Sequence, residues 1–114
     1  MRERRRAPRR HTPHRLNVVA ADSDTVLGRL VDITPGGLML VAPRTWPEGD
    51  PLQVRIPLPT VINGRVELEL EIESVWQAPD DNPRFHRTGF RFVAIGGEDA
   101  YIIETVMHRL HLVG

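Results

Sequence analysis

Residues 65–76 read RVELELEIESVW, and this stretch carries the clearest structural signal in the chain. Apolar side chains alternate with charged ones from Val66 to Ile72, and a period of two is typical of a β-strand with one buried and one solvated face. The phase slips at Ser74-Val75-Trp76, which predicts a bulge or bend there. The solvated face would carry four acidic side chains: Glu67, Glu69, Glu71 and Glu73.

The residues before this strand predict its antiparallel partner. Asn63-Gly64 is a turn signal of the kind that joins the two strands of a hairpin. Ahead of the turn, the segment from Leu52 to Leu58 again alternates apolar and polar positions, so we expect a second half-buried strand. Pro57 has no backbone N–H to donate, which places its part of the strand at an edge or an end.

Short apolar segments bounded by turn residues predict further strands on both sides of this hairpin. They cover residues 16–21, 25–33, 38–42 and 88–95. Residues 34–37, Thr-Pro-Gly-Gly, are expected to form a tight turn in which proline sets φ and glycine permits a positive φ.

The end of the chain changes to helical spacing. Glu98 and Asp99 would lie in the first turn of this helix, where the helix dipole favours acids. The apolar positions that repeat with a helical period are Ile102, Ile103, Val106, Met107 and Leu110. Five or six strands and one terminal helix favour a small all-β barrel with the helix packed on it.

The bulk composition indicates a single globular domain without disulfides. A length of 114 residues suits one domain, and 40 % hydrophobic residues suit a packed core. No apolar run approaches the roughly 20 residues that cross a bilayer, so neither membrane insertion nor a secretory signal is expected. Cysteine is absent, which excludes thiolate nucleophiles and cysteine-based zinc sites. We therefore expect a cytoplasmic protein.

Charge divides the chain into two parts. Residues 1–15 hold seven arginines and one acid, whereas residues 16–114 hold eight arginines and fourteen acids. The net charge of zero thus combines a segment of +6 with a body of −6. Residues 1–15 also lack apolar periodicity, so we expect a flexible basic arm over 1–15 and the barrel with its helix over 16–114.

Two segments contain residue types suited to ligand binding. Residues 4–10 read RRRAPRR, and arginine forks bind phosphate oxygens or the O6/N7 edge of guanine in pairs. Taken alone, this run more often marks a solvated tail or a non-specific binder of nucleic acid or acidic membrane. Residues 32–37 read DITPGG, with Asp32 and Thr34 on the same side of an extended segment. Taken alone, this segment is more often an ordinary hairpin turn.

Together, the two segments resemble those of the PilZ domain family of bacterial cyclic di-GMP receptors. Residues 5–9, Arg-Arg-Ala-Pro-Arg, are similar to the family's R-x-x-x-R motif, and residues 32–37 are similar to its D-x-S/T-x-x-G motif about twenty residues downstream. The resemblance extends over essentially the whole chain, including the strand ending at Trp76 and the closing helix. It implies a six-stranded antiparallel split barrel with a C-terminal helix.

The resemblance also implies roles for individual residues. Arg5 and Arg9 would close over the bound nucleotide and contact its phosphates and guanine Hoogsteen edges. Asp32, Thr34 and Gly37, with Gly36 beside them, would line the barrel-side wall and hydrogen-bond a guanine.

Two more residues extend the implied site. In the family, a basic residue at the place of Arg4 tends to accompany an intercalated nucleotide dimer. Trp76 occupies a position that lies beside the ligand in some members, and core packing at the bend explains it equally well.

Two features depart from the family's pattern or leave its alignment open. Thr34 stands where serine is usual, and its methyl group would crowd the guanine or stiffen the turn. Arg6 and Arg10 also satisfy R-x-x-x-R, but the alignment on Arg5 and Arg9 places Pro8 directly before the second arginine, as the family tends to have it.

The resemblance implies a ligand-gated adaptor and not an enzyme: cyclic di-GMP orders the arm, and the reshaped surface engages or releases an unidentified downstream protein. The alternative is a degenerate PilZ-like interaction module that does not bind the nucleotide. No metal or further cofactor is expected, because His108 and His111 are better explained as surface residues facing the helix dipole. Specific nucleic-acid binding is not expected, because the body is acidic and lacks an aromatic stacking face.

Overall fold

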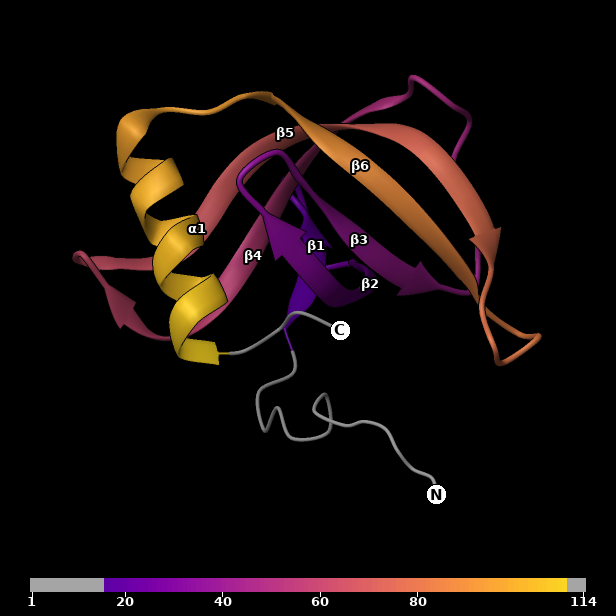
Figure 1. Ribbon diagram of the computed structural model, residues 1–114, viewed down its shortest axis with the longest axis horizontal. Helices are drawn as coiled ribbons and strands as arrows, with labels where there is room; N and C mark the ends of the chain where they lie inside the picture. Colours follow the sequence, from indigo (N-terminus) through magenta and orange to yellow (C-terminus); the bar gives the residue numbers. More distant parts are fainter. Residues whose placement is uncertain (1–15, 111–114) are drawn as a thin grey trace.

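The computed structural model describes residues 16–110, which form six strands and one helix. In chain order they are β1 (Asn17–Ala20), β2 (Val26–Thr34), β3 (Gly37–Ala42), β4 (Pro51–Ile62), β5 (Arg65–Pro79), β6 (His86–Ala94) and α1 (Gly97–Leu110). All six strands pair antiparallel and close into a barrel in the order β1-β2-β3-β6-β5-β4, with β4 returning to β1 (Figure 1). This confirms the fold class that the strand and helix patterns predict.

The hairpin of β4 and β5 follows the sequence signals closely. Asn63 and Gly64 have φ values of 54° and 78°, the positive angles that a two-residue hairpin turn of type I′ requires. Pro57 pairs with Glu67 on β5 but lies past Val54 and Arg55, the residues of β4 that pair with β1. Its missing N–H therefore removes no hydrogen bond from the β1–β4 ladder. Between Val66 and Ile72 the exception to the buried apolar face is Val66, which is 64 % exposed and lies opposite the irregular part of the β4–β5 register, between Pro57 and Ile62.

Two bulges set which side chains face outward. On β5, Ser74 pairs with Phe90 and Trp76 with Gly89, so Val75 is the extra residue, as the phase slip predicts. On β2, Leu30 pairs with Leu40 on β3, but the next pair joins Asp32 to Met39, which leaves Val31 as the extra residue. The sequence did not indicate this second bulge.

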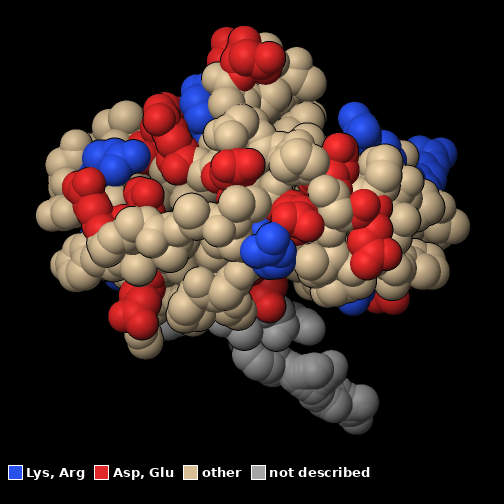
Figure 2. All heavy atoms as spheres, turned by 90° about the horizontal axis from the view of Figure 1, so that it is seen from above, with Lys and Arg blue, Asp and Glu red and all other residues tan. Residues whose placement is uncertain are grey.

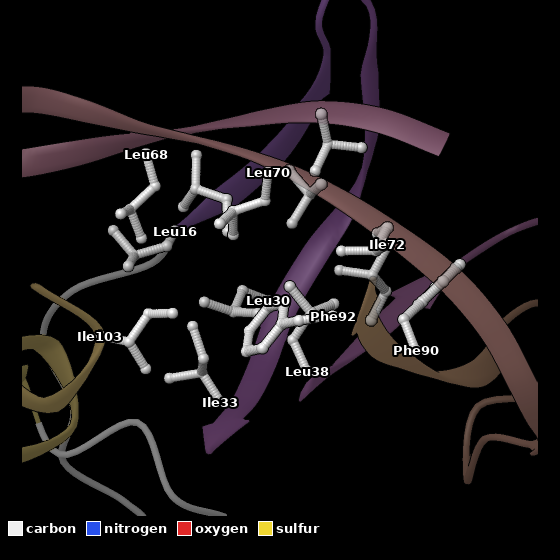
Figure 3. Packing of buried hydrophobic residues seen from close by; sticks show 14 of the residues in the cluster. Leu16, Leu30, Ile33, Leu38, Leu68, Leu70, Ile72, Phe90, Phe92 and Ile103 are labelled. Carbon is white, nitrogen blue, oxygen red and sulfur yellow. The ribbon is translucent and has the colours of Figure 1, made fainter. Parts of the chain in front are cut away.

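The core fills the barrel and extends under α1. Inward side chains from all six strands form one cluster with Ile102, Ile103 and Val106 of the helix. These three helix residues are each 1 % exposed or less. Figure 3 shows Ile103 beside Leu16 and Ile33 at this end of the core. The helix therefore continues the hydrophobic core, as its apolar spacing predicts; the side chain of Leu110 lies outside the described residues.

The tip of the β4–β5 hairpin is fastened to the first turn of α1. Arg65 reaches the carboxylates of Glu98 and Asp99 at 3.4 and 3.6 Å, and the Asn63 amide donates to Glu98 at 3.2 Å. In Figure 1 the helix lies across one end of the barrel beside this hairpin, which leaves the outer face of β2, β3 and β6 uncovered by the helix.

Candidate functional site

A hollow of about 250 Å³ lies where the β2–β3 turn meets β5 and β6. Nine residues line it: Asp32, Thr34, Gly36, Gly37, Leu38, Met39, Trp76, Gly89 and Phe90. The structure therefore brings together all five site residues expected from the barrel, although Trp76 is about forty residues from the others in the chain.

Strand register explains this assembly. Residues paired across the four adjacent strands form one row that runs β2, β3, β6, β5 through Asp32, Met39, Gly89 and Trp76. A neighbouring row runs in the same order through Thr34, Gly37, Arg91 and Glu73. Side chains in such rows project from one face of the sheet. Gly37 and Gly89, the glycines in these rows, therefore leave a trough between the polar residues on β2 and the larger side chains on β5 and β6.

Asp32 is the most distinctive polar group in this trough. The bulge at Val31 turns Asp32 outward even though Leu30 and Ile33 on either side are buried in the core. One carboxylate oxygen, Oδ1, is buried and has no hydrogen-bond partner among residues 16–110. A buried acceptor without a donor is costly, so this oxygen is suited to receive a donor from a ligand.

Thr34 shapes the turn that borders the hollow. Its hydroxyl accepts a hydrogen bond from the backbone N–H of Gly36 at 3.3 Å and donates to the carbonyl of Gly37 at 3.4 Å. These two contacts need only a hydroxyl, which serine and threonine both supply. The side chain of Thr34 is exposed, and its methyl group is not enclosed by the core.

The two glycines of the motif differ in what requires them. A Cβ on Gly37 would collide with the backbone carbonyl oxygen of Phe90, so only glycine allows β3 and β6 to approach as they do. A Cβ on Gly36 would meet nothing closer than the Thr34 hydroxyl oxygen at 4.0 Å. The expectation of a positive φ in this turn is wrong: within the described chain, positive φ occurs at Gly49, Asn63 and Gly64.

Trp76 lies on the outside of the barrel and not in its core. The bulge at Val75 directs Ser74 inward and Trp76 outward, and the indole is 48 % exposed. It covers Gly89, where a Cβ would lie 2.8 Å from Cζ2 of the indole and closer still to Nε1. The structure thus rules out core packing as the explanation for Trp76 and places the indole beside the hollow.

Four further residues line the hollow that the sequence did not identify as site residues: Leu38, Met39, Gly89 and Phe90. Gly89 had a usable signal, since a glycine inside a strand often marks a close approach of another group. Beneath the hollow, Phe90 packs edge-to-face on buried Trp46 with ring centroids 5.5 Å apart. This aromatic contact gives the site a rigid floor.

The three site arginines expected from the arm, Arg4, Arg5 and Arg9, lie outside the described residues. Leu16, the first described residue, accepts a hydrogen bond at 2.8 Å from the backbone N–H of Leu30. The chain therefore enters the barrel beside β2, two residues before Asp32. The rest of the barrel surface carries many carboxylates, and acidic side chains gather over much of the face shown in Figure 2.

A family model of the PilZ domain matches residues 3–108, which include both the arginine-rich segment and the barrel. The chain belongs to the PilZ domain family. Among curated proteins, none matches this PilZ domain. Between residues 16 and 110 the structure contains neither a helix long and apolar enough to cross a membrane nor a group of three metal-ligating side chains.

Solved structures similar to this PilZ domain include the Bacillus subtilis inhibitor of motility (MotI/DgrA). The TM-score is 0.68 at 20 % identity, over 95 % of this chain and 54 % of that one. The PilZ domain of YcgR from Escherichia coli, solved with c-di-GMP, gives 0.61 at 17 % identity, over 96 % and 92 %. MrkH of K. pneumonia in its apo state gives 0.67 at 16 % identity, over 96 % and 53 %. The chain spans about half the length of MotI and MrkH, and these similarities concern the fold.

Proposed function

We propose that this PilZ domain is a cyclic di-GMP receptor that acts as an adaptor for another protein. The observation that carries the proposal is the carboxylate of Asp32 in the hollow between Thr34 and Trp76, whose buried Oδ1 has no hydrogen-bond partner among residues 16–110. Guanine presents two adjacent donors, N1–H and N2–H₂, which a carboxylate accepts together. Adenine lacks this pair of donors, so Asp32 would select guanine.

The arm supplies the positive charge that the barrel lacks. Cyclic di-GMP carries two phosphates, and residues 16–114 have a net charge of −6 that would repel it. Arg5 and Arg9 provide forks that match phosphate oxygens and the O6/N7 edge of guanine. The seven backbone steps from Arg9 to Leu16 span at most about 25 Å when extended, which is enough to reach the hollow from beside β2.

The compared structures support the same class of function. The YcgR domain was solved with c-di-GMP, and MotI is described as an inhibitor of motility. By analogy, ordering of the arm over the nucleotide would create or remove a surface for a protein partner, without catalysis. A cytoplasmic location suits such a receptor and a chain without cysteine.

Titration calorimetry with cyclic di-GMP tests the proposal, and the chain provides a charge-matched control. Arg5→Ala/Arg9→Ala and Arg6→Ala/Arg10→Ala remove equal charge from the same segment. We expect the first pair to weaken binding at least about a hundredfold, because two charge-assisted contacts are lost, and the second pair to weaken it only a few-fold. Equal losses would indicate non-specific attraction, and a loss confined to the second pair would shift the motif to Arg6 and Arg10.

The barrel half of the site is tested with Asp32→Asn and with cyclic di-AMP, which has the same charge as cyclic di-GMP. We expect wild type to bind only the guanine nucleotide and Asp32→Asn to lose about tenfold or more in affinity. No heat from wild type would reject the receptor function and leave the alternative of a docking module that does not bind the nucleotide.

The number of nucleotides per chain tests the role of Arg4. The guanidinium of Arg4, directly before the motif, can stack on or pair with a second nucleotide. We therefore propose that wild type binds an intercalated dimer. The expected ratio is two nucleotides per chain in wild type and one in Arg4→Ala. A ratio of one in wild type would contradict this role.

A further inference from the structure

The row of the sheet that contains Thr34 and Gly37 continues onto Arg91 of β6, directly opposite Gly37. Arg91 faces outward, because its neighbours Phe90 and Phe92 are both buried in the barrel. It is not among the residues that line the hollow, because its guanidinium is turned the other way, toward β5. There Nη2 donates to Oε1 of Glu73 at 2.7 Å.

This ion pair is placed so that it can exchange. The Arg91 and Glu73 side chains are 51 % and 29 % exposed, and ion pairs in such surroundings contribute little to stability. Arg87, four residues before Arg91, is held differently, with Asp80 at 2.9 Å and Asp81 at 3.7 Å, and these carboxylates raise the pKa of Arg87. The single carboxylate on Arg91 is the weaker restraint.

On β3, the residue paired with Arg91 adds no side chain to this row. That residue is Gly37, which has no side chain and cannot acquire one without colliding with the Phe90 carbonyl. A rotation of the Arg91 side chain would therefore move the guanidinium from above Glu73 to above Gly37, at the edge of the hollow. Adjacent strands are about 4.8 Å apart, so Glu73 on β5 and Gly37 on β3 each lie one strand spacing from Arg91. The guanidinium of Arg91 can reach over either strand.

We propose that Arg91 is a further ligand-binding arginine in this protein. Unlike the arginines of the arm, it is supplied by the barrel, and Glu73 holds it until the nucleotide binds. A phosphate of the bound nucleotide replaces the Glu73 carboxylate, since both present paired oxygens to the guanidinium fork. Glu73 thereby competes with the ligand and sets its affinity. This inference rests on the proposed function, because it concerns the same nucleotide.

The test is a double-mutant cycle in the same calorimetric assay. Glu73→Gln removes the competitor, so we expect binding of cyclic di-GMP to become about two- to five-fold tighter, the range that corresponds to a surface ion pair. Arg91→Gln removes the guanidinium but leaves a polar side chain, and it should weaken binding about five-fold or more. In the Arg91→Gln background, Glu73→Gln should have no effect, because the carboxylate then has no arginine to withhold.

Glu69→Gln is the matched control. Glu69 lies on the outer face of the same strand, about 13 Å from Glu73 along β5, and carries the same charge. If Glu69→Gln tightens binding as much as Glu73→Gln, the effect is general electrostatics and the exchange is refuted. If Arg91→Gln binds like wild type while Arg5→Ala/Arg9→Ala does not, the receptor function stands and this inference fails. If wild type gives no heat, both fail.

Discussion

The indole of Trp76 covers the backbone of Gly89, and the two residues depend on each other. Trp76 can lie against the sheet only because position 89 has no side chain, and Gly89 is shielded on that side by the indole. This contact joins β5 to β6 at the edge of the hollow, where it sets the orientation of the half-exposed indole that lines the site.

Gly89→Ala is therefore expected to displace Trp76. The added Cβ collides with the end of a side chain that is half exposed, so the indole can swing toward solvent and the stability cost should stay near 1 kcal/mol. Tryptophan emission should shift to longer wavelength, and cyclic di-GMP should bind more weakly. The emission is compared with that of Trp76→Phe, which leaves only buried Trp46. An unshifted spectrum in Gly89→Ala would contradict the contact.

Gly37→Ala and Gly36→Ala should have very different effects on folding. At position 37 the Cβ meets backbone and cannot be relieved by a side-chain rotation, so we expect a loss of about 2–4 kcal/mol in the free energy of unfolding. At position 36 the space is open, and we expect a change within about 0.5 kcal/mol. Urea denaturation measures both. Equal losses would mean that the approach of β3 to β6 does not require glycine.

Thr34 is tested by separating its hydroxyl from its methyl group. Thr34→Val keeps the shape but removes both hydrogen bonds in the turn, and it should cost about 1 kcal/mol of stability and weaken nucleotide binding. Thr34→Ser keeps the hydroxyl and should retain stability within about 0.5 kcal/mol. If Thr34→Ser also binds cyclic di-GMP more tightly than wild type, the methyl group limits affinity; equal affinities would show that it does not.

The loop between β5 and β6 should contribute to acid sensitivity through Asp80. The hydrogen bond from Arg87, aided by the backbone N–H of Asn82, lowers the pKa of the Asp80 carboxyl below its ordinary value. Its contribution to stability is then complete above the pKa of the unfolded chain, about 3.9, and is lost as the pH falls from there through the lower folded pKa. Asp80→Asn should be less stable than wild type at pH 6, and the difference should shrink toward pH 3.

Denaturation midpoints measured across this range, with Asp81→Asn as the control, check the assignment. Asp81 carries the same charge in the same loop but is fully exposed and lies 3.7 Å from Arg87. If Asp81→Asn removes the pH dependence and Asp80→Asn retains it, the acid sensitivity comes from Asp81, and the prediction for Asp80 is wrong.

The local patterns of the chain were sufficient for much of the fold. The alternation in residues 65–76 located β5, and the Asn-Gly pair located a turn whose positive φ angles few other residues adopt at low cost. The change to helical spacing after residue 97 located α1. These features depend on neighbouring residues only, because strand, turn and helix periods are properties of the local backbone.

The assembly of the site depended on contacts between strands far apart in the sequence. Nothing local to Val31 signals the bulge that turns Asp32 outward, and nothing local to Arg91 shows that it lies opposite Gly37. Likewise, the need for glycine at position 37 comes from the Phe90 carbonyl, and not from φ as the turn alone suggested. Amino-acid order was enough to identify the strands, the turn and the motif residues, whereas closure of the barrel alone set their register and hence which side chains meet in the hollow.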